Sequence, residues 1–285
     1  MSNRAILLIH CPDQKGILAK ITDFLYQKGG NITYLDQHVD QEESHFFMRV
    51  EWELKNFQLD RDAIGPVFAH ELGEPLGLFW RLYYSDYRPK AAILCSKEPH
   101  CLDDILARKS SGEWDLDIPL IISNHGHLAE TAGRFGIDFA HIPVVKEKKW
   151  EAEAQQLELL REHQIDFIVL ARYMQIISDD FVGHYPNKII NIHHSFLPAF
   201  AGAKPYHAAF ERGVKIIGAT SHYVTAELDQ GPIIDQSTTR ISHHDRVADL
   251  VRKGRDLEKL VLSRAIWLHL NRKLLVYKNR TVVFV

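Results

Sequence analysis

Three polar residues late in the chain have the types and the spacing of a catalytic group. Asn191 and His193 stand two apart around the end of the short apolar run 188–192, and Asp229 lies in an Asp-Gln-Gly-Pro turn. Side chains two apart on a strand share a face, and ligands of open α/β sheets bind where strands end. An amide donor, an imidazole and a carboxylate can together stabilise a developing oxyanion and move a proton. This pattern predicts an enzyme.

The composition of the 285 residues is that of a globular protein, since 46% are hydrophobic and 25% are charged. This length fits one large domain or two of ordinary size. A net charge of -3 does not suggest binding to nucleic acid or to a membrane surface. The sequence shows neither a signal-peptide pattern nor an apolar run long enough to span a membrane. The odd set of cysteines, Cys11, Cys95 and Cys101, suits a reducing compartment. We therefore expect a cytoplasmic protein without nucleic-acid or membrane partners.

Residues 1–84 show one pattern of elements. We expect strands at 5–10, 32–39, 45–52 and 78–83, with helices at 17–28 and 61–71. The order β-α-β-β-α-β is that of a ferredoxin-like α+β domain. The polar stretch 85–90 then predicts a linker.

Residues 91–285 show a second pattern, in which apolar strands alternate with helices. Short apolar strands between amphipathic helices predict a Rossmann-like, mostly parallel sheet covered on both faces. The expected strands are 91–95, 118–122, 167–170, 188–192, 274–277 and 281–285, and the expected helices are 102–109, 129–135, 150–163, 179–184 and 247–270. The last two strands, around 278–280, predict a hairpin.

Several of these motifs resemble known proteins. Asn-x-His, the following Ser-Phe-Leu-Pro and the later Leu-Asp-x-Gly-Pro-Ile-Ile resemble the formyltransferase domain that handles 10-formyltetrahydrofolate. The fuller strings 188–206 and 11–18 are similar to the formyltetrahydrofolate deformylase family, in which an ACT domain precedes the formyl-handling domain. The resemblance spans essentially the whole chain. It implies hydrolysis of 10-formyltetrahydrofolate to formate and tetrahydrofolate, which supplies formate for purine synthesis, in a homo-oligomer without a further cofactor.

The resemblance also assigns the catalytic group to Asn191, His193 and Asp229, and the chemistry of these side chains agrees. One amide donor of Asn191 would contribute roughly 3–4 kcal/mol to stabilising an oxyanion. His193 can donate to the same oxygen or orient water, and Asp229 is the natural proton relay. Because a free aspartate has a pKa of about 3.9, we expect a dry site that raises the pKa of Asp229. Taken singly, each residue could instead be structural.

The folate site is placed by resemblance alone. The segment 170–178 is similar to the one that lines the pterin pocket in the family, with the loop 225–231 opposite it. These segments and the residues after the catalytic loop supply the candidates Arg172, Tyr173, Met174, Gln175, Ile177, Tyr206, His207, Leu228 and Gly231. Gln175 departs from the arginine of many relatives, which puts one substrate contact in doubt. Tyr173 and Met174 could instead be core residues.

The resemblance to ACT domains implies an amino-acid effector at the turns that contain Asp13, Gly16 and Asn31. A helix N-terminus suits a ligand carboxylate, and a glycine lets the backbone approach it closely. The alternative is that Asp13 caps the helix and that the domain serves only to assemble subunits.

The seventeen histidines suggest a metal site, with the pairs 125/127, 193/194 and 243/244 as candidates. None has a zinc-binding spacing, and neighbouring histidines on a strand point to opposite faces. We expect no catalytic metal, and Ser242 or Asp245 to cap the last long helix.

The acceptor of the formyl group distinguishes two enzyme classes. Superfamily members that act on a phosphorylated amine carry a glycine-rich loop after the first strand of this domain. Here the loop 96–102 has no glycine, and it contains Glu98 and Pro99. Water is therefore the expected acceptor. An amine-directed formyltransferase and a non-catalytic folate or amino-acid sensor remain the alternatives.

Overall fold

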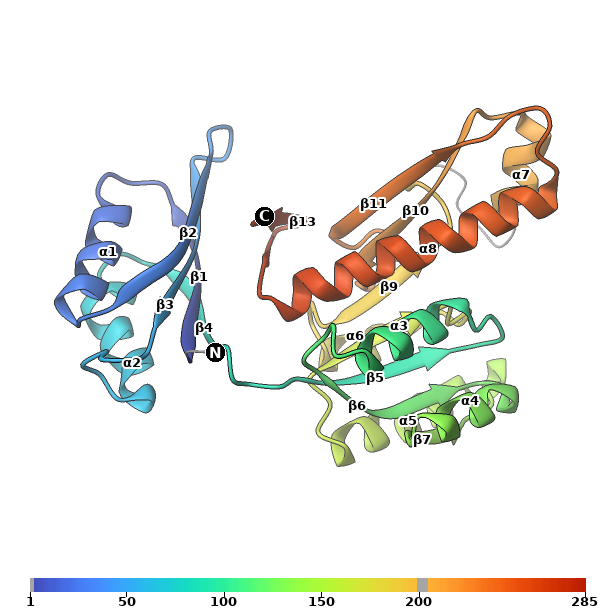
Figure 1. Cartoon of the computed structure of the whole chain (residues 1–285), viewed down its shortest axis with the longest axis horizontal. Helices are drawn as coiled ribbons and strands as arrows, with labels where there is room; N and C mark the ends of the chain where they lie inside the picture. Colours follow the sequence, from blue (N-terminus) through green and yellow to red (C-terminus); the bar gives the residue numbers. More distant parts are fainter. Residues whose placement is uncertain (1–2, 199–204) are drawn as a thin grey trace. The chain divides into compact units, whose positions relative to one another are not determined.

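In the computed structural model, which describes residues 3–198 and 205–285, the first segment is an antiparallel sheet with helices on one face (Figure 1). Its elements are β1 (Arg4–Pro12), α1 (Ile17–Gln27), β2 (Asn31–Asp40), β3 (His45–Glu53), α2 (Arg61–Phe68), a π-helical turn (Ala69–Gly73) and β4 (Phe79–Tyr84). The strand order is β2-β3-β1-β4, and each neighbouring pair is antiparallel. The predicted ferredoxin-like order is confirmed.

The core of this segment lies between the sheet and its two helices. Alternate residues of β1, from Ala5 to Cys11, are buried against Ile21 of α1 and Phe68 of α2. The opposite set of β1 residues faces the other side of the sheet, as the period of two requires. Helix α2 is shorter than predicted and ends at Phe68. Pro66 lies inside it and lacks a backbone donor, and the chain continues as a π-helical turn.

The second segment has a seven-stranded sheet with order β11-β10-β9-β8-β5-β6-β7. Its strands are β5 (Lys90–Cys95), β6 (Asp117–Ser123), β7 (Asp138–His141), β8 (Phe167–Ala171), β9 (Ile189–His193), β10 (Ile216–Tyr223) and β11 (Ile233–Arg240). Its helices are α3 (His100–Ser110), α4 (Ala129–Arg134), α5 (Lys149–Glu162), α6 (Asp179–His184), α7 (Pro205–Arg212) and α8 (Val247–Leu270), with 3-10 turns at Gly126–Leu128 and Lys146–Lys148. The predicted mostly parallel sheet is confirmed.

The exceptions to parallel pairing lie at one edge of this sheet. The pairs β9–β10 and β10–β11 are antiparallel, whereas β5 pairs in parallel with both β6 and β8. Neither β10 nor β11 was predicted, because Thr220, Ser221 and His222 interrupt the apolar run of β10 and most of β11 is only partly buried.

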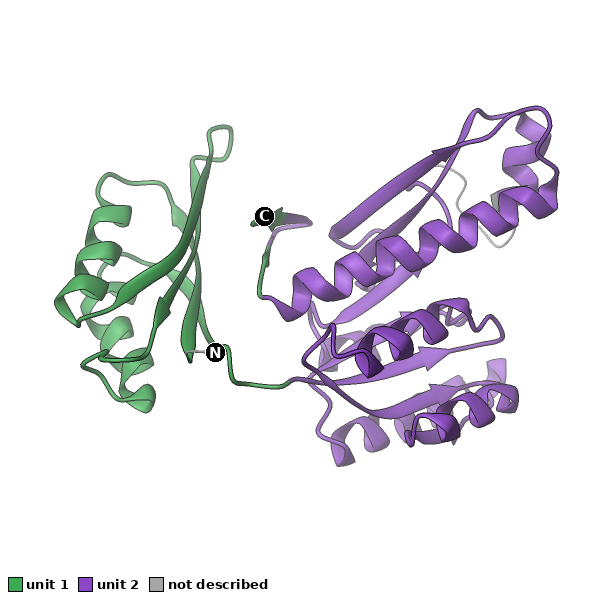
Figure 2. Cartoon of the chain, viewed as in Figure 1, with its two compact units in different colours: residues 1–88, 272–275, 282–285 green, residues 89–271, 276–281 purple. Residues whose placement is uncertain are grey.

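The chain divides into two compact units (Figure 2). The first unit comprises Met1–Arg88 with Arg272–Leu275 and Val282–Val285, and the second comprises Pro89–Asn271 with Val276–Thr281. The boundary between Arg88 and Pro89 lies inside the stretch 85–90 expected to be a linker. The last strands, β12 (Leu274–Tyr277) and β13 (Arg280–Val283), pair with each other. The sequence pattern places them wholly in the second segment, but their outer ends group with the first unit.

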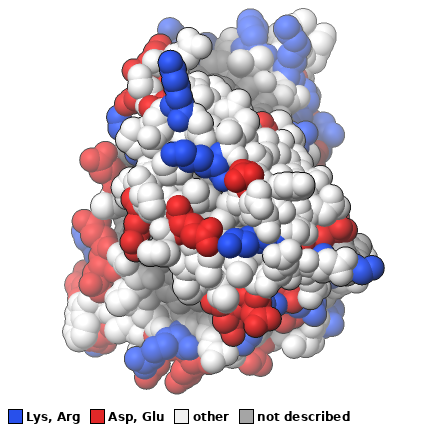
Figure 3. Space-filling model, turned by 90° about the vertical axis from the view of Figure 1, so that its left-hand side faces the viewer, with Lys and Arg blue, Asp and Glu red and all other residues white. Residues whose placement is uncertain are grey.

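Acidic and basic side chains are interspersed over the face of the molecule shown in Figure 3. Among the helices of residues 3–198 and 205–285, none combines the length and the apolar character that crossing a membrane requires.

Candidate active site

Strands β9 and β10 place Asn191 beside a residue that the sequence pattern did not reveal. In the antiparallel register Asn191 is opposite His222, and Nδ2 of Asn191 lies 3.1 Å from Nε2 of His222. Nδ1 of His222 is 2.9 Å from the carbonyl of Tyr223, which can only accept, so Nδ1 carries a proton. In the neutral ring Nε2 then accepts from the amide of Asn191, whereas in the protonated ring Nε2 donates to Oδ1 of Asp229, 3.5 Å away. His222 is therefore a further candidate site residue, and recognising β10 as a strand paired with β9 would have revealed it.

Asp229 reaches the same place from the turn between β10 and β11. Its Oδ2 lies 3.2 Å from Nδ1 of His193, and its Oδ1 lies 3.5 Å from Nε2 of His222. The backbone of Asp229 has φ 56°, a left-handed conformation that aspartate tolerates better than most residues. The structure thus brings together the three predicted catalytic side chains.

The charge of Asp229 differs from the expectation. Hydrogen bonds with His193 and then with His222 hold the pKa of Asp229 well below its usual range. Burial acts in the opposite direction but is outweighed by these two contacts. The prediction of a raised pKa was wrong, and Asp229 is a carboxylate at neutral pH.

His193 and His194 correct a second expectation. Strand β9 ends at His193, so the two rings do not obey strand alternation. Their centroids lie 5.2 Å apart with an interplanar angle of 27°, which is a stacked arrangement. Both side chains are buried and line the same cavity. Within the described part of the chain, Nε2 of His193 has no hydrogen-bonding partner in the protein, which leaves this atom for a ligand.

A cavity of about 560 Å³ opens in front of these residues. Asn191, His193, His222 and Asp229 line it. The predicted folate-binding residues on its wall are Arg172, Tyr173, Met174, Gln175, Ile177, Leu228 and Gly231. Its size and mixed lining are those of a pocket for a small organic ligand.

Tyr206 and His207, also predicted to bind folate, are not among the described residues that line the cavity. They begin α7, where Tyr206 is buried and His207 is exposed. The ring of Tyr206 packs against α8 at Gly254, where a Cβ would lie 2.1 Å from its hydroxyl. Residues 199–204 of the similar string 188–206 lie outside the described residues.

The wall segment after β8 is fixed by polar contacts to its neighbours. The backbone N–H of Met174 donates to Oγ of Ser96 at 3.0 Å. The side chain of Ser178 caps α6 by accepting from Phe181 N–H. The hydroxyl of Tyr173 lies 3.0 Å from Nε2 of the buried Gln156, and burial raises the pKa of Tyr173 to about 12. These contacts orient a wall that is preformed in the protein.

Arg172 faces both the cavity and a buried carboxylate. Its Nε lies 3.3 Å from the carboxylate of Glu258. This carboxylate also accepts a hydrogen bond from the hydroxyl of Tyr206 at 2.5 Å, and it lies 2.8 Å from Nε2 of His100. Burial raises the pKa of Glu258, but the contacts with His100, Arg172 and Tyr206 outweigh it and lower this pKa. Glu258 is therefore a buried, satisfied anion.

The described residues contain one group with three potential metal ligands close together, namely His100, Cys101 and Glu258, whose ligand atoms lie within 4.8 Å of one another. The guanidinium of Arg172 beside Glu258 already supplies a positive charge there. Burial also holds the pKa of Cys101 well above its usual value, so its thiolate is disfavoured. This donor set does not fit a metal ion.

The three proposed effector-site residues do not meet within one chain. Asp13 and Gly16 follow the end of β1, whereas Asn31 begins β2 and is paired with Glu53. Glu53 in turn is opposite Arg4, at the start of β1. Asn31 thus lies at the other end of strands some nine residues long, about 30 Å at 3.3 Å per residue. The alternative that Asp13 caps α1 is wrong, because the N-cap is Gly16 without a side-chain bond.

Similarity to known families agrees with this architecture. The family model for the ACT domain matches residues 5–62, and that for formyl transferase matches residues 89–266. The glycinamide ribonucleotide transformylase 1 of Symbiobacterium toebii superposes with a TM-score of 0.66 at 30% identity, covering 72% of this chain and 98% of its own. The fold and the site therefore define an ACT domain joined to a formyl transferase domain.

Relatives that match over the whole length are more specific. A formyltetrahydrofolate deformylase of Synechocystis is 56% identical over 280 residues, covering 98% of both chains. One of Bacillus subtilis is 44% identical and covers 98% of this chain and 93% of its own. The crystal structure of a formyltetrahydrofolate deformylase from Pseudomonas syringae superposes with a TM-score of 0.97 at 44% identity, covering 100% and 95%. The chain belongs to the formyltetrahydrofolate deformylase family.

Proposed function

We propose that this chain hydrolyses 10-formyltetrahydrofolate to formate and tetrahydrofolate. The observation that carries the proposal is the convergence of Asn191, His193 and Asp229 on one cavity. That cavity is faced on one side by the predicted pterin-binding segment and on the other by the turn that contains Leu228. In this proposal the formate supplies purine synthesis and the reaction balances the one-carbon folate pools.

The proposed reaction starts with attack of water on the formyl carbon, which forms a C–O bond and places negative charge on the carbonyl oxygen. His222 holds one amide N–H of Asn191, and the second N–H can donate to this oxyanion together with a protonated His193. The proton lost by water passes through Asp229 to the leaving nitrogen, and the C–N bond then breaks. Because Asp229 contacts both histidines, it moves the proton as part of this group.

Water rather than an amine is the proposed acceptor. The loop after β5 has no glycine, and Pro99, which lacks an amide donor, is the N-cap of α3. Glu98 in this loop is held by Arg255 at 2.5 Å, so a carboxylate stays at the start of α3. This carboxylate competes with the phosphate of an amine acceptor for Arg255 and for the start of α3.

Purified full-length protein with 10-formyltetrahydrofolate tests the proposal. We expect formate and tetrahydrofolate in equal amounts, without any amine and without acceleration by glycinamide ribonucleotide. Formation of a formylated amine with little formate would establish a transferase instead. Binding of tetrahydrofolate without formate or transfer would establish a sensor.

We also propose that the first unit binds a small amino acid and that the chain forms a homo-oligomer. The turn after β1 supports the first part, because Gly16, at φ 89°, opens α1 next to the exposed Asp13. Asn31 would contribute only if a second copy of the chain brought it there. Thermal shifts with single amino acids and sedimentation of the full chain test the two parts separately.

A further inference from the structure

The turn that carries Asp229 is bonded by the C-terminal hairpin, residues 274–283. At the hairpin tip, Nδ2 of Asn279 donates to the backbone carbonyl of Gln230 at 2.8 Å. On the second strand, Oγ1 of Thr281 donates to the carbonyl of Ile233 at 2.6 Å. These bonds lie on both sides of the Gly231-Pro232 end of the turn. The hairpin thus holds the backbone next to the carboxylate of the site.

This turn depends on such support. The left-handed φ of Asp229 is one that a non-glycine residue adopts only when its surroundings hold it. Within the turn, the N–H of Gln230 reaches the carbonyl of Glu227 at 3.2 Å. A displacement of about 1 Å in a catalytic group can cost about 100-fold in rate. The hydrogen bonds to the carbonyls of Gln230 and Ile233 therefore help to hold Asp229 in position.

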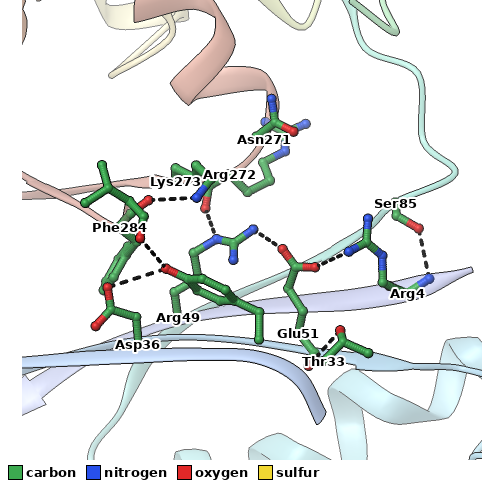
Figure 4. A network of polar contacts seen from close by, with 12 residues as sticks. Arg4, Thr33, Asp36, Arg49, Glu51, Ser85, Asn271, Arg272, Lys273 and Phe284 are labelled. Atoms are coloured by element: carbon green, nitrogen blue, oxygen red, sulfur yellow. Dashed lines mark hydrogen bonds and ion pairs between the residues drawn. The ribbon is translucent and has the colours of Figure 1, made fainter. Parts of the chain in front are cut away.

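The outer ends of the hairpin strands belong to the first unit, together with the residues that flank them. Figure 4 shows Arg49 between the carboxylate of Glu51 and the backbone of Arg272. Arg49 is 2% exposed, and its Nε donates to the carbonyl of Arg272 at 2.8 Å. Phe284 is 1% exposed, and its N–H donates to the carbonyl of Lys273 at 2.9 Å. A buried ion pair and a buried ring thus anchor the base.

We propose that the C-terminal hairpin positions the Asp229 turn from an anchor in the first unit, and that it carries changes in that unit to the catalytic group. Val276–Thr281 group with the second unit and the residues on both sides of them with the first, so each strand of the hairpin passes from one unit to the other. Asn279 and Thr281 are then positioning residues. The inference rests on the proposed function in taking Asp229 as part of the catalytic group.

Variants at the tip test the positioning. Asn279→Ala and Thr281→Val each remove one bond, and Arg280→Ala, an exposed side chain between them, is the matched control. We expect kcat to fall about 10-fold in the two variants, with KM, tetrahydrofolate affinity and Tm close to wild type. Amide hydrogen exchange in residues 227–233 should speed up in both variants and not in the control.

Two outcomes contradict the positioning role. Unchanged kcat and exchange would show that the bonds do not hold the turn. A raised KM with normal exchange would show that Asn279, which also lines the cavity, acts by touching the substrate.

Variants at the base test the transmission. Phe284→Leu loosens the anchor, and Phe68→Leu makes a similar change in the helix-side core of the same unit. Of the two leucine variants, we expect only Phe284→Leu to lower kcat and to speed up amide exchange in residues 227–233. The double variant Phe284→Leu/Asn279→Ala should lose less kcat than the product of the two single losses. Equal effects of both leucine variants on kcat and exchange, or no effect of Phe284→Leu, would contradict the proposal that the hairpin carries changes in the first unit to the catalytic group. Formate release by the wild type decides the proposed function separately, since hydrogen exchange needs no turnover.

Discussion

Asp229 has two imidazoles as partners, and this decides what its carboxylate can do. Its partners lower its pKa, so it remains ionised and can accept a proton, but they also make it a weaker base than a free aspartate. Asp229→Asn keeps the shape and removes the charge and the proton-accepting oxygen. We expect kcat to fall about 10²–10⁴-fold while tetrahydrofolate binding persists, measured by formate release and calorimetry. Near-normal turnover would remove Asp229 from the proposed mechanism.

The same carboxylate sets a dependence of stability on pH. Its pKa in the folded chain lies below its ordinary value of 3.8, so its contribution to stability is present above pH 3.8 and is lost as the pH falls further. Asp229→Asn lacks this contribution. The difference in unfolding free energy between wild type and variant should therefore shrink below about pH 4, followed by denaturant unfolding at several pH values. A difference that grows on acidification would contradict the lowered pKa.

At the scale of single residues, the sequence identified Asn191, His193 and Asp229 because their types and spacing are visible in it. It did not identify His222, and it gave the wrong direction for the pKa of Asp229. The pKa depends on which partners lie within hydrogen-bonding distance of Asp229. The first is His193, and the second, His222, comes from β10 through a strand pairing that its polar residues conceal.

At the scale of elements, the turn between β10 and β11 depends on a glycine. A Cβ at Gly231 would lie 1.8 Å from the carbonyl oxygen of Tyr223, which belongs to the backbone and cannot move aside cheaply. Gly231→Ala should therefore lower the unfolding free energy by about 1–3 kcal/mol or more and reduce kcat. Gly133→Ala, in α4 with open space around it, is the control and should be neutral or stabilising. Thermal unfolding and formate release of both variants check this.

The elements that the sequence predicted well are those with a simple hydrophobic period. Strands β5, β6, β8 and β9 are mostly apolar and mostly buried, and α8 follows its predicted bounds 247–270. Its predicted cap was wrong: Arg246 is the N-cap, and its backbone N–H donates to Oδ2 of Asp249 at 3.1 Å. Local polar residues indicated a cap nearby, but only the path of the chain into the helix decides which residue provides it.

At the scale of the whole molecule, the pattern of elements in the sequence changes near 85–90, and the boundary between the two units, between Arg88 and Pro89, lies in this stretch. The grouping of the last residues could not be foreseen in the same way. Leu274, Leu275 and Phe284 read as ordinary hairpin residues, and only long-range contacts show that they belong with the N-terminal sheet. Sequence patterns report local periodicity, whereas this grouping depends on residues more than 200 positions apart, such as Arg49 and Arg272.

A chain that begins at Pro89 tests how far the second unit is independent. Such a chain keeps Asn191, His193 and Asp229 but loses the unit with which Leu274, Leu275 and Phe284 group. Exposing these apolar side chains should favour aggregation, and replacing them with Ser or Gln should restore solubility. We expect the soluble form to release formate with a kcat about 10-fold lower than the full chain and no response to amino acids, because the hairpin has lost its anchor. Full activity in that form would show that the hairpin holds the catalytic turn without the first unit.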